Sequence, residues 1–212
     1  MLREETLRYL RYNNQLLTEE QEAMIDGAIS EVIRASEPRT VHRIFDLTEA
    51  GGVLAIDAAI DLHYGDLQKL LEGCGKCLLI AGTLGAELDR RMRYFSHVDT
   101  VKYVIMDAAA SALIEEACDN LMNSLPFSEL TFRFSPGYGD VPLELQKQLL
   151  SVLDAGRRIG LTLTPQCLMM PQKSISGIAG IGTSDAKRTC DDCLRKDSCE
   201  YRRNHTVCYQ TK

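Results

Sequence analysis

The order of predicted secondary-structure elements in this sequence indicates an α+β fold followed by a cysteine-rich C-terminal tail. Two helical segments come first, and strands and helices then follow in a mixed order without the regular alternation of a βαβ fold. Four of the eight cysteines lie between residues 190 and 208, in a segment with almost no aliphatic residues. We therefore divide the 212 residues into a domain, 1–182, and a tail, 183–212.

The overall composition excludes some classes of partner. The net charge is -6 and the pI is about 5.3, which argues against nucleic acid as a main partner, because phosphate neutralisation requires clustered Lys and Arg. The sequence has no apolar run of about 18 residues and no signal-peptide pattern. We therefore expect a cytoplasmic protein that does not insert into a membrane.

The N-terminal 37 residues have helical patterns. Leucines near one face predict a helix over residues 2–12, and Asn13 and Asn14 interrupt it. Thr18 then begins a second helix, with Gln21 three residues later as the reciprocal member of a capping box. Pro38 follows the end of that helix.

The next segments alternate between strands and helices. We predict strands over residues 40–47, 51–56 and 76–83, and a short helix over residues 67–73. Gly51 and Gly52 form the turn before the second strand, and the continuous apolar run "KCLLIAGT" is typical of a buried strand. Residues 84–125 form two helices with a break near Ser96 and His97.

The C-terminal part of the domain contains a strand, a loop, a helix and two more strands. In "ELTFRF", residues 129–134, alternation places Leu130, Phe132 and Phe134 on one face and Thr131 and Arg133 on the other. Pro142 suits the first turn of a helix over residues 143–158. We expect the last two strands over residues 160–164 and 173–181.

Arg133 and the loop that follows it are candidate ligand-binding residues. A guanidinium group can bind a carboxylate in a bidentate fork, and a loop with glycines can present backbone N–H groups to a ligand. Tyr138 can stack or form a hydrogen bond. The competing interpretation is a surface arginine before an ordinary turn, and composition alone favours it. Glu115 and Glu116 on the long helix either hold a ligand amine or ribose, or belong to a solvated face.

The tail is a candidate metal site. Cys190, Cys193, Cys199 and Cys208 supply four thiolates that suit either a tetrahedral zinc or an iron–sulfur cluster. Metal binding would also provide the folding free energy that a segment without an apolar core lacks. The alternative is a disordered tail with reduced thiols or adventitious disulfides. Cys74 is a second candidate for the fourth ligand, in place of Cys208.

Residues 133–178 carry a specific resemblance to a known family. The segment "RFSPGYGDVPLELQKQLLSVLDAGRRIGLTLTPQCLMMPQKSISGI" resembles the activation domain of cobalamin-dependent methionine synthase. The features that match in order and spacing are Arg133, Pro136-Gly137-Tyr138, Pro142, Gly160 with Leu163-Thr164, Met169 with Pro171, and Ser174 with Ser176-Gly177. Upstream of this segment, the likeness is limited to the order of helices and strands.

The resemblance implies a fold and a ligand. The family's domain binds S-adenosylmethionine in a shallow groove on a twisted antiparallel sheet flanked by helices. By resemblance, Arg133 holds the ligand carboxylate, and the backbone from Ser135 through Pro136 and Gly137 to Tyr138 contacts the ligand. The chain departs from the family where "GTSDAKRTCDDC" replaces a last strand that carries two tyrosines.

The resemblance also implies a function. The chain lacks the catalytic and cobalamin-binding modules, so we expect a free-standing accessory protein that reactivates a corrinoid-dependent methyltransferase, methionine synthase being the first candidate. In the family, an electron from a redox partner returns cob(II)alamin to cob(I)alamin, and S-adenosylmethionine then donates its methyl group. No general acid or base is needed. The alternative is a non-catalytic module that binds S-adenosylmethionine or a corrinoid protein, with a structural metal in its tail.

Overall fold

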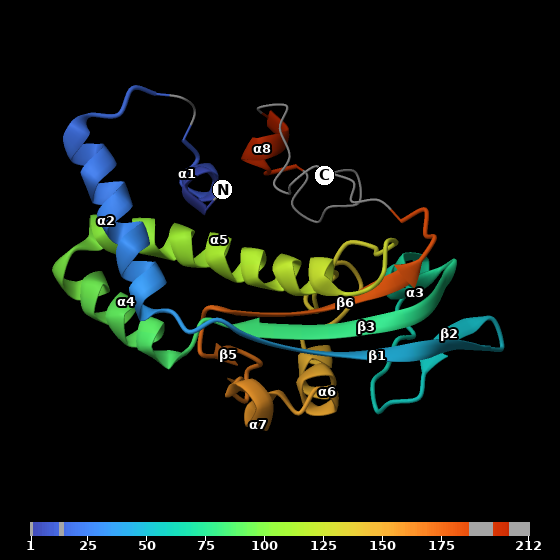
Figure 1. The fold of residues 1–212 in the computed structure, drawn as a ribbon. Helices are drawn as coiled ribbons and strands as arrows, with labels where there is room; N and C mark the ends of the chain where they lie inside the picture. The colour runs from blue at the N-terminus through green and yellow to red at the C-terminus, as the bar shows by residue number, and fades with distance from the viewer. Residues whose placement is uncertain (1, 13–14, 187–196, 204–212) are drawn as a thin grey trace.

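The computed structural model describes residues 2–12, 15–186 and 197–203. Its helices and strands follow one another along the chain (Figure 1) as α1 (Leu2–Tyr9), α2 (Glu19–Ala35), β1 (Arg39–Ala50), β2 (Val53–Ile56), α3 (Gly65–Leu71), β3 (Cys74–Thr83), α4 (Ala86–Val98), α5 (Thr100–Ser124), α6 (Leu145–Val152), α7 (Ala155–Ile159), β4 (Thr162–Leu163), β5 (Met169–Met170), β6 (Ser174–Gly182) and α8 (Glu200–Arg203).

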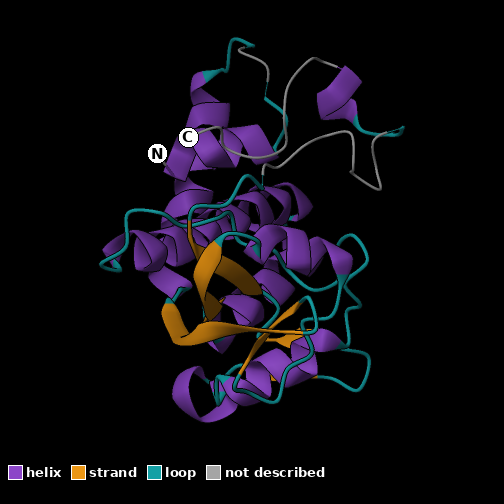
Figure 2. Cartoon of the chain, turned by 90° about the vertical axis from the view of Figure 1, so that its right-hand side faces the viewer, coloured by secondary structure: helices purple, strands orange, loops and turns teal. Residues whose placement is uncertain are grey.

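A four-stranded antiparallel sheet forms the centre of the molecule. Its strand order is β2-β1-β3-β6, so β6 lies at one edge, and β4 and β5 form a separate small sheet. β3 pairs with β1 through Val41 opposite Ala81, and with β6 through Ile80 opposite Gly177. The helices lie above and below this sheet, as Figure 2 shows. The predicted α+β fold with an antiparallel sheet flanked by helices is confirmed.

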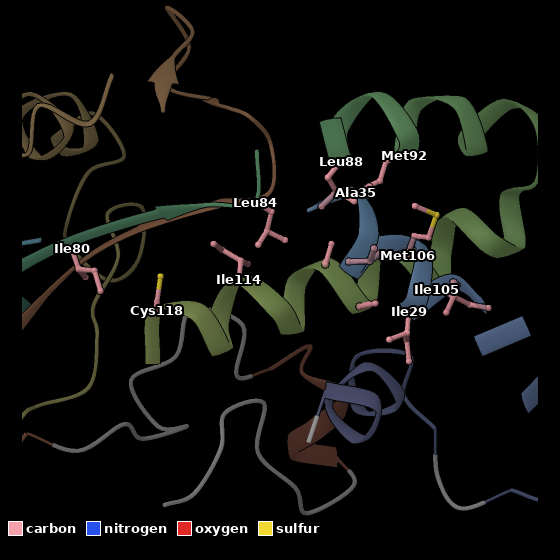
Figure 3. Close-up of a cluster of buried hydrophobic side chains, with 14 of the residues drawn as sticks. Ile29, Ala35, Ile80, Leu84, Leu88, Met92, Ile105, Met106, Ile114 and Cys118 are labelled. Atoms are coloured by element: carbon pink, nitrogen blue, oxygen red, sulfur yellow. The ribbon is translucent and has the colours of Figure 1, made fainter. Parts of the chain in front are cut away.

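The central strand contributes to two hydrophobic cores. Leu78 and Ile80 face a first core with α1, α2, α4 and α5, part of which Figure 3 shows. Leu79 and Ala81 face a second core with α3, α6 and α7. Both faces of β3 are therefore buried, which explains why its sequence is a continuous apolar run rather than an alternating one.

Local sequence signals determine the ends of several helices. Thr18 and Gln21 form the predicted capping box, with distances of 3.2 Å from Gln21 N to Thr18 Oγ1 and 3.0 Å from Thr18 N to Gln21 Oε1. Asp99 ends α4 and caps α5 by accepting a hydrogen bond from Lys102 N. The break between these two helices therefore lies slightly beyond the predicted position. Among the helices of the described residues, none combines the length and hydropathy that crossing a bilayer requires.

Two predicted elements differ from the structure. Residues 143–158 form α6 and α7 rather than one helix, because Asp154 adopts a left-handed backbone conformation between them. Residues 129–134 make only two isolated bridges to β6, Leu130 with Ile181 and Phe134 with Ile178. The predicted common face of Leu130 and Phe134 is wrong: the register shifts by one residue between these bridges, so Leu130 packs on the first core while Phe134 packs on the second.

Candidate functional site

Arg133 belongs to the segment beside β6, and its side chain contacts the long helix α5. Its side chain is only 5% exposed, and its guanidinium pairs with Glu115 and Asp119. The distance from Nη1 to Asp119 Oδ1 is 3.1 Å, and Met122 Sδ lies 3.4 Å from the same nitrogen. We call Arg133, Glu115 and Asp119 the arginine cluster.

The absence of a side chain at Gly177 makes room for this arrangement. A Cβ atom at Gly177 would lie 2.3 Å from Arg133 Cγ and 2.9 Å from Arg133 Cδ, so the aliphatic part of the arginine crosses β6 in the space that this glycine leaves. Alternation along residues 129–134 correctly places Arg133 opposite Phe132 and Phe134, since both aromatic rings pack on the second core. The position of the arginine therefore depends on close contact with the edge strand.

The arginine cluster has a net negative charge. Burial alone would lower the pKa of Arg133, but the charge of Glu115 and contacts with Asp119 outweigh it, so the pKa of the guanidinium is raised and the group stays charged. The side chains of Glu115 and Asp119 are 44% and 40% exposed. The buried guanidinium of Arg133 therefore pairs with two carboxylates that are each partly exposed to solvent.

Pro136 ends the pairing of this segment with β6. Phe134 exchanges two backbone hydrogen bonds of 2.8 Å with Ile178, and the register beyond that bridge would place Pro136 opposite Ser176. Proline has no N–H group to donate, so the ladder cannot continue there. The chain turns away through Gly137 and the exposed Tyr138. The loop Ser135–Tyr138 therefore begins directly after Phe134, the last residue of the segment that pairs with the outer edge of β6.

The loop is fixed from its other end by α3. The carboxylate of Asp140 accepts hydrogen bonds from Gly65 N at 2.7 Å and Asp66 N at 3.2 Å, and Asp140 N donates to Asp66 Oδ2 at 3.1 Å. Asp140 therefore caps α3, whose own N-cap residue, Tyr64, makes no side-chain capping bond. Gly139, with φ of 55°, leaves room for Asp66, because an added Cβ would lie 1.9 Å from Oδ2.

A pocket of about 270 Å³ opens beside the arginine cluster and shares Glu115 with it. Three parts of the chain line it: α1, α5 and residues 172–175, which include the start of β6. The lining residues are Tyr9, Ser111, Ile114, Glu115, Gln172, Lys173, Ser174 and Ile175. None of the predicted loop residues, Ser135 to Tyr138, is among them.

Lys173 fixes the third wall of the pocket to α5. Its Nζ lies 2.9 Å from Asp107 Oδ1 and 2.9 Å from Ser111 Oγ, and donates to the Asp107 carbonyl at 3.1 Å. Ser111 and Asp119 are eight residues apart on α5, which corresponds to about 12 Å along the helix axis. The pocket and the arginine cluster together therefore form a continuous polar strip along α5.

The predicted metal ligands lie largely outside the described residues. This applies to Cys190, Cys193 and Cys208, whereas Cys199 is described and half-buried just before α8. Cys74 is also half-buried, at the start of β3. Within the described residues, no three His, Cys, Asp or Glu side chains come together as a metal site. Burial raises the pKa of Cys77 and of Cys118 to about 12, so these two cysteines are neutral thiols of the core.

Sequence reasoning found Arg133 and raised Glu115 as a ligand-holding carboxylate, but it missed Asp119, Lys173 and Tyr9. The spacing of Glu115 and Asp119, i and i+4 on one helix face, is a signal that could have paired them with one cation. Lys173 and Tyr9 come from parts of the chain that meet only in the folded molecule. For them, the sequence contains no local signal.

Comparisons with known proteins agree with this description. Residues 127–204, which include Arg133, the loop and β6, match the family described as "Vitamin B12 dependent methionine synthase, activation domain". A solved structure titled "Crystal Structure of the MetH Reactivation Domain bound to AdoHcy" has a similar fold, with a TM-score of 0.62 and 18% identity, over 94% of this chain and 76% of that one. No curated protein matches the sequence. The resemblance to the activation domain of cobalamin-dependent methionine synthase is confirmed.

Proposed function

We propose that this chain, with the fold of a methionine synthase activation domain, binds S-adenosylmethionine and reactivates a cobalamin-dependent methyltransferase. Its partner would be a corrinoid-binding methionine synthase or a related enzyme, and a separate electron-donor protein would supply the electron. The chain itself would position the methyl donor. The observation that supports this proposal best is the arginine cluster beside an open pocket.

The charge of the arginine cluster suits this ligand. One guanidinium and two carboxylates give a net charge of -1, and both carboxylates are accessible to solvent. S-adenosylmethionine carries a sulfonium, an ammonium and a carboxylate, and thus a net charge of +1. Its two cationic groups can lie against Glu115 and Asp119, and its carboxylate can reach Arg133 if the guanidinium exchanges one of its present partners. The cluster therefore favours the methyl donor over its product, S-adenosylhomocysteine, whose net charge is zero.

The chemistry requires positioning rather than proton transfer. The carbon–sulfur bond breaks as the methyl group moves to the partner's reduced cobalt, and S-adenosylhomocysteine is the leaving group. Holding the sulfonium in one orientation reduces the entropic part of the barrier. Asp140 and Gly139 make the loop rigid on one side of the cluster, and Lys173 fixes the opposite wall. These contacts orient the ligand before the partner docks.

The tail is proposed as a metal site with ligands Cys190, Cys193, Cys199 and Cys208. An iron–sulfur cluster there would relay the electron, whereas a zinc would organise the tail for docking. The two metals are distinguished by colour and by metal analysis of chain purified without oxygen. Chain that contains neither metal would contradict the proposal for the tail and leave the ligand site unaffected.

Titration calorimetry with S-adenosylmethionine tests the ligand site directly. We expect the wild-type chain to bind, and Arg133→Ala to lose most of its affinity, because Glu115 and Asp119 would lose the charge that holds them in place. Arg90→Ala is the matched control, since Arg90 is 72% exposed and pairs with Glu87 on its own helix. Absence of binding by the wild-type chain would contradict the proposed function. Equal binding by Arg133→Ala would remove that residue from the site.

A second experiment tests the reaction. S-adenosylmethionine labelled in its methyl group is incubated with the full chain, a chemical reductant and a methionine synthase that lacks its own activation domain. We expect label to appear on the corrinoid only when this chain is present. Binding without any methyl transfer would instead support a non-catalytic binding module.

A further inference from the structure

Tyr9 is the only aromatic residue among those that line the pocket, and it comes from the N-terminal helix. It shares the pocket lining with Ser111, Ile114 and Glu115 of α5 and with residues 172–175. Burial, followed by the charge of Glu115, raises the pKa of Tyr9, so its phenol stays neutral near neutral pH. A neutral aromatic ring therefore forms one wall of an otherwise polar pocket.

The ring of Tyr9 is held by its surroundings. The guanidinium carbon of Arg8 lies 4.7 Å from the ring centroid, and Arg8 itself pairs with Glu5 at 2.8 Å. Arg3 connects α1 to α2, through Asp26 at 2.9 Å and through Glu22. Leucines of α1 pack against the first core. Because one face of the ring carries the guanidinium, a ligand would stack against another part of the aromatic surface.

The residues that line the pocket with Tyr9 offer groups that can pair with the edge of a base. Gln172 lines the pocket and is exposed, and its backbone N–H donates to Asp89 Oδ2 at 2.8 Å. A carboxamide can pair with an adenine edge through one donor and one acceptor. Glu115 adds a carboxylate that can accept hydrogen bonds from ribose hydroxyls. The volume of about 270 Å³ suits a nucleoside rather than the whole ligand.

We infer that Tyr9 is the base-stacking residue of the site, and that the adenosyl group of the ligand lies between Tyr9 and Gln172. This inference rests on the proposed function, because it assigns the nucleoside to the pocket and the sulfonium and amino acid to the arginine cluster. The separation of about 12 Å between Ser111 and Asp119 along α5 accommodates both ends of one extended ligand.

The chain has no tryptophan, so a single Tyr9→Trp substitution gives a unique fluorescent reporter. We expect its emission to be quenched as S-adenosylhomocysteine is added, because the indole would stack on the purine. Tyr94→Trp is the matched control: Tyr94 lies on α4, is 56% exposed and does not line the pocket. Its emission should not change with the ligand.

Calorimetry with S-adenosylmethionine completes the test. We expect Tyr9→Leu to raise the Kd about tenfold, within the range measured for base stacking on aromatic side chains, and Tyr9→Phe to bind like the wild type. The Tyr9→Trp titration alone serves as the test if the leucine variant does not fold. Wild-type chain that does not bind would overturn the proposed function and this inference with it. Wild-type binding that Tyr9→Leu retains, with no quenching in Tyr9→Trp, would overturn this inference alone.

Discussion

Replacing Gly177 with alanine should separate Arg133 from Glu115 and Asp119, although none of these three residues is itself substituted. The added Cβ would lie 2.3 Å from Arg133 Cγ, 2.9 Å from Cδ and 3.1 Å from the carbonyl oxygen of Phe134. Cγ lies close to the backbone, and the guanidinium is held at its far end by Glu115 and Asp119. The arginine therefore cannot avoid the new methyl group by a small rotation, and must leave its place.

The size of the effect follows from three contributions. Overpacking typically costs about 1–3 kcal/mol. The ion pairs of Arg133 contribute about 1 kcal/mol, because both carboxylates are partly exposed and solvent screens them. Reduced entropy of the unfolded chain offsets about 0.4–1 kcal/mol. We expect Gly177→Ala to lower the free energy of unfolding by about 2 kcal/mol, and the Tm by about 4–8 °C for a chain of this size.

Thermal and urea unfolding of paired variants measure this effect. Gly27→Ala is the control, since Gly27 lies within α2 and an added Cβ would meet no atom within 4 Å. That variant should gain about 0.5–1 kcal/mol, because alanine is the better helix former. If Gly177→Ala is as stable as the wild type, then the described path of Arg133 across β6 is wrong.

A double variant separates the two possible sites of the clash. In an Arg133→Ala background, the close Cγ and Cδ atoms are gone and only the 3.1 Å contact to Phe134 remains. Gly177→Ala should then cost less than half of what it costs in the wild type, which is a coupling of about 1 kcal/mol between the two positions. An equal cost in both backgrounds would mean that the backbone of residues 133–134, rather than the arginine, resists the substitution.

Three further predictions follow from other contacts. Glu31→Gln should cost about 1–2 kcal/mol at pH 7, since Glu31 is 6% exposed and Arg91 Nε lies 2.7 Å from it. Burial opposes the charge of Glu31, but Arg91 lowers its pKa below the ordinary value. This contribution is therefore complete above about pH 4.5 and disappears as the pH falls through the lowered pKa. Urea unfolding of the wild type and Glu31→Gln at pH 7 and at a pH below the lowered pKa will show whether their stabilities converge in acid. Asp140→Ala should cost about 1 kcal/mol through loss of the α3 cap, and an unchanged urea midpoint would argue against that role. Cys199→Ser should reduce the metal content of anaerobically purified chain, and undiminished metal would exclude Cys199 as a ligand.

Elements with strong local signals could be predicted from the sequence. The capping box of Thr18 and Gln21 is confirmed at both hydrogen bonds, and Gly51 and Gly52 form the predicted turn with positive φ. The apolar run of β3 correctly indicated a strand buried on both faces. In each case the determining interaction lies within a few residues, or depends only on hydrophobicity.

Segment 129–134 shows why other elements could not be predicted. Its alternation correctly placed Arg133, but the hydroxyl of Thr131 accepts a hydrogen bond of 2.8 Å from Gly180 N, in place of a backbone carbonyl. Together with the one-residue shift in register, this leaves bridges instead of a continuous ladder. Such competition between side chain and backbone depends on a partner about 50 residues away, which no local pattern encodes.

The candidate site was predicted only in part, for the same reason. Arg133 was expected to face a ligand, and the structure shows it engaged by Glu115 and Asp119. The role of the loop from Ser135 to Tyr138 stays a prediction. Tyr9 and Lys173 reach the pocket from distant parts of the sequence, so their proximity depends on the packing of α1 and β6 around α5.

The contribution of α1 to the pocket affects local opening of the molecule. Residues 10–17 connect α1 to α2, and their described part contains no further helix or strand. A helix joined by such a connection can detach transiently while the sheet stays folded, which exposes its amides to hydrogen exchange. A ligand that needs Tyr9 in place binds only the closed form. At one hundred times its Kd, it should slow exchange of the α1 amides about a hundredfold and leave the amides of β3 nearly unaffected.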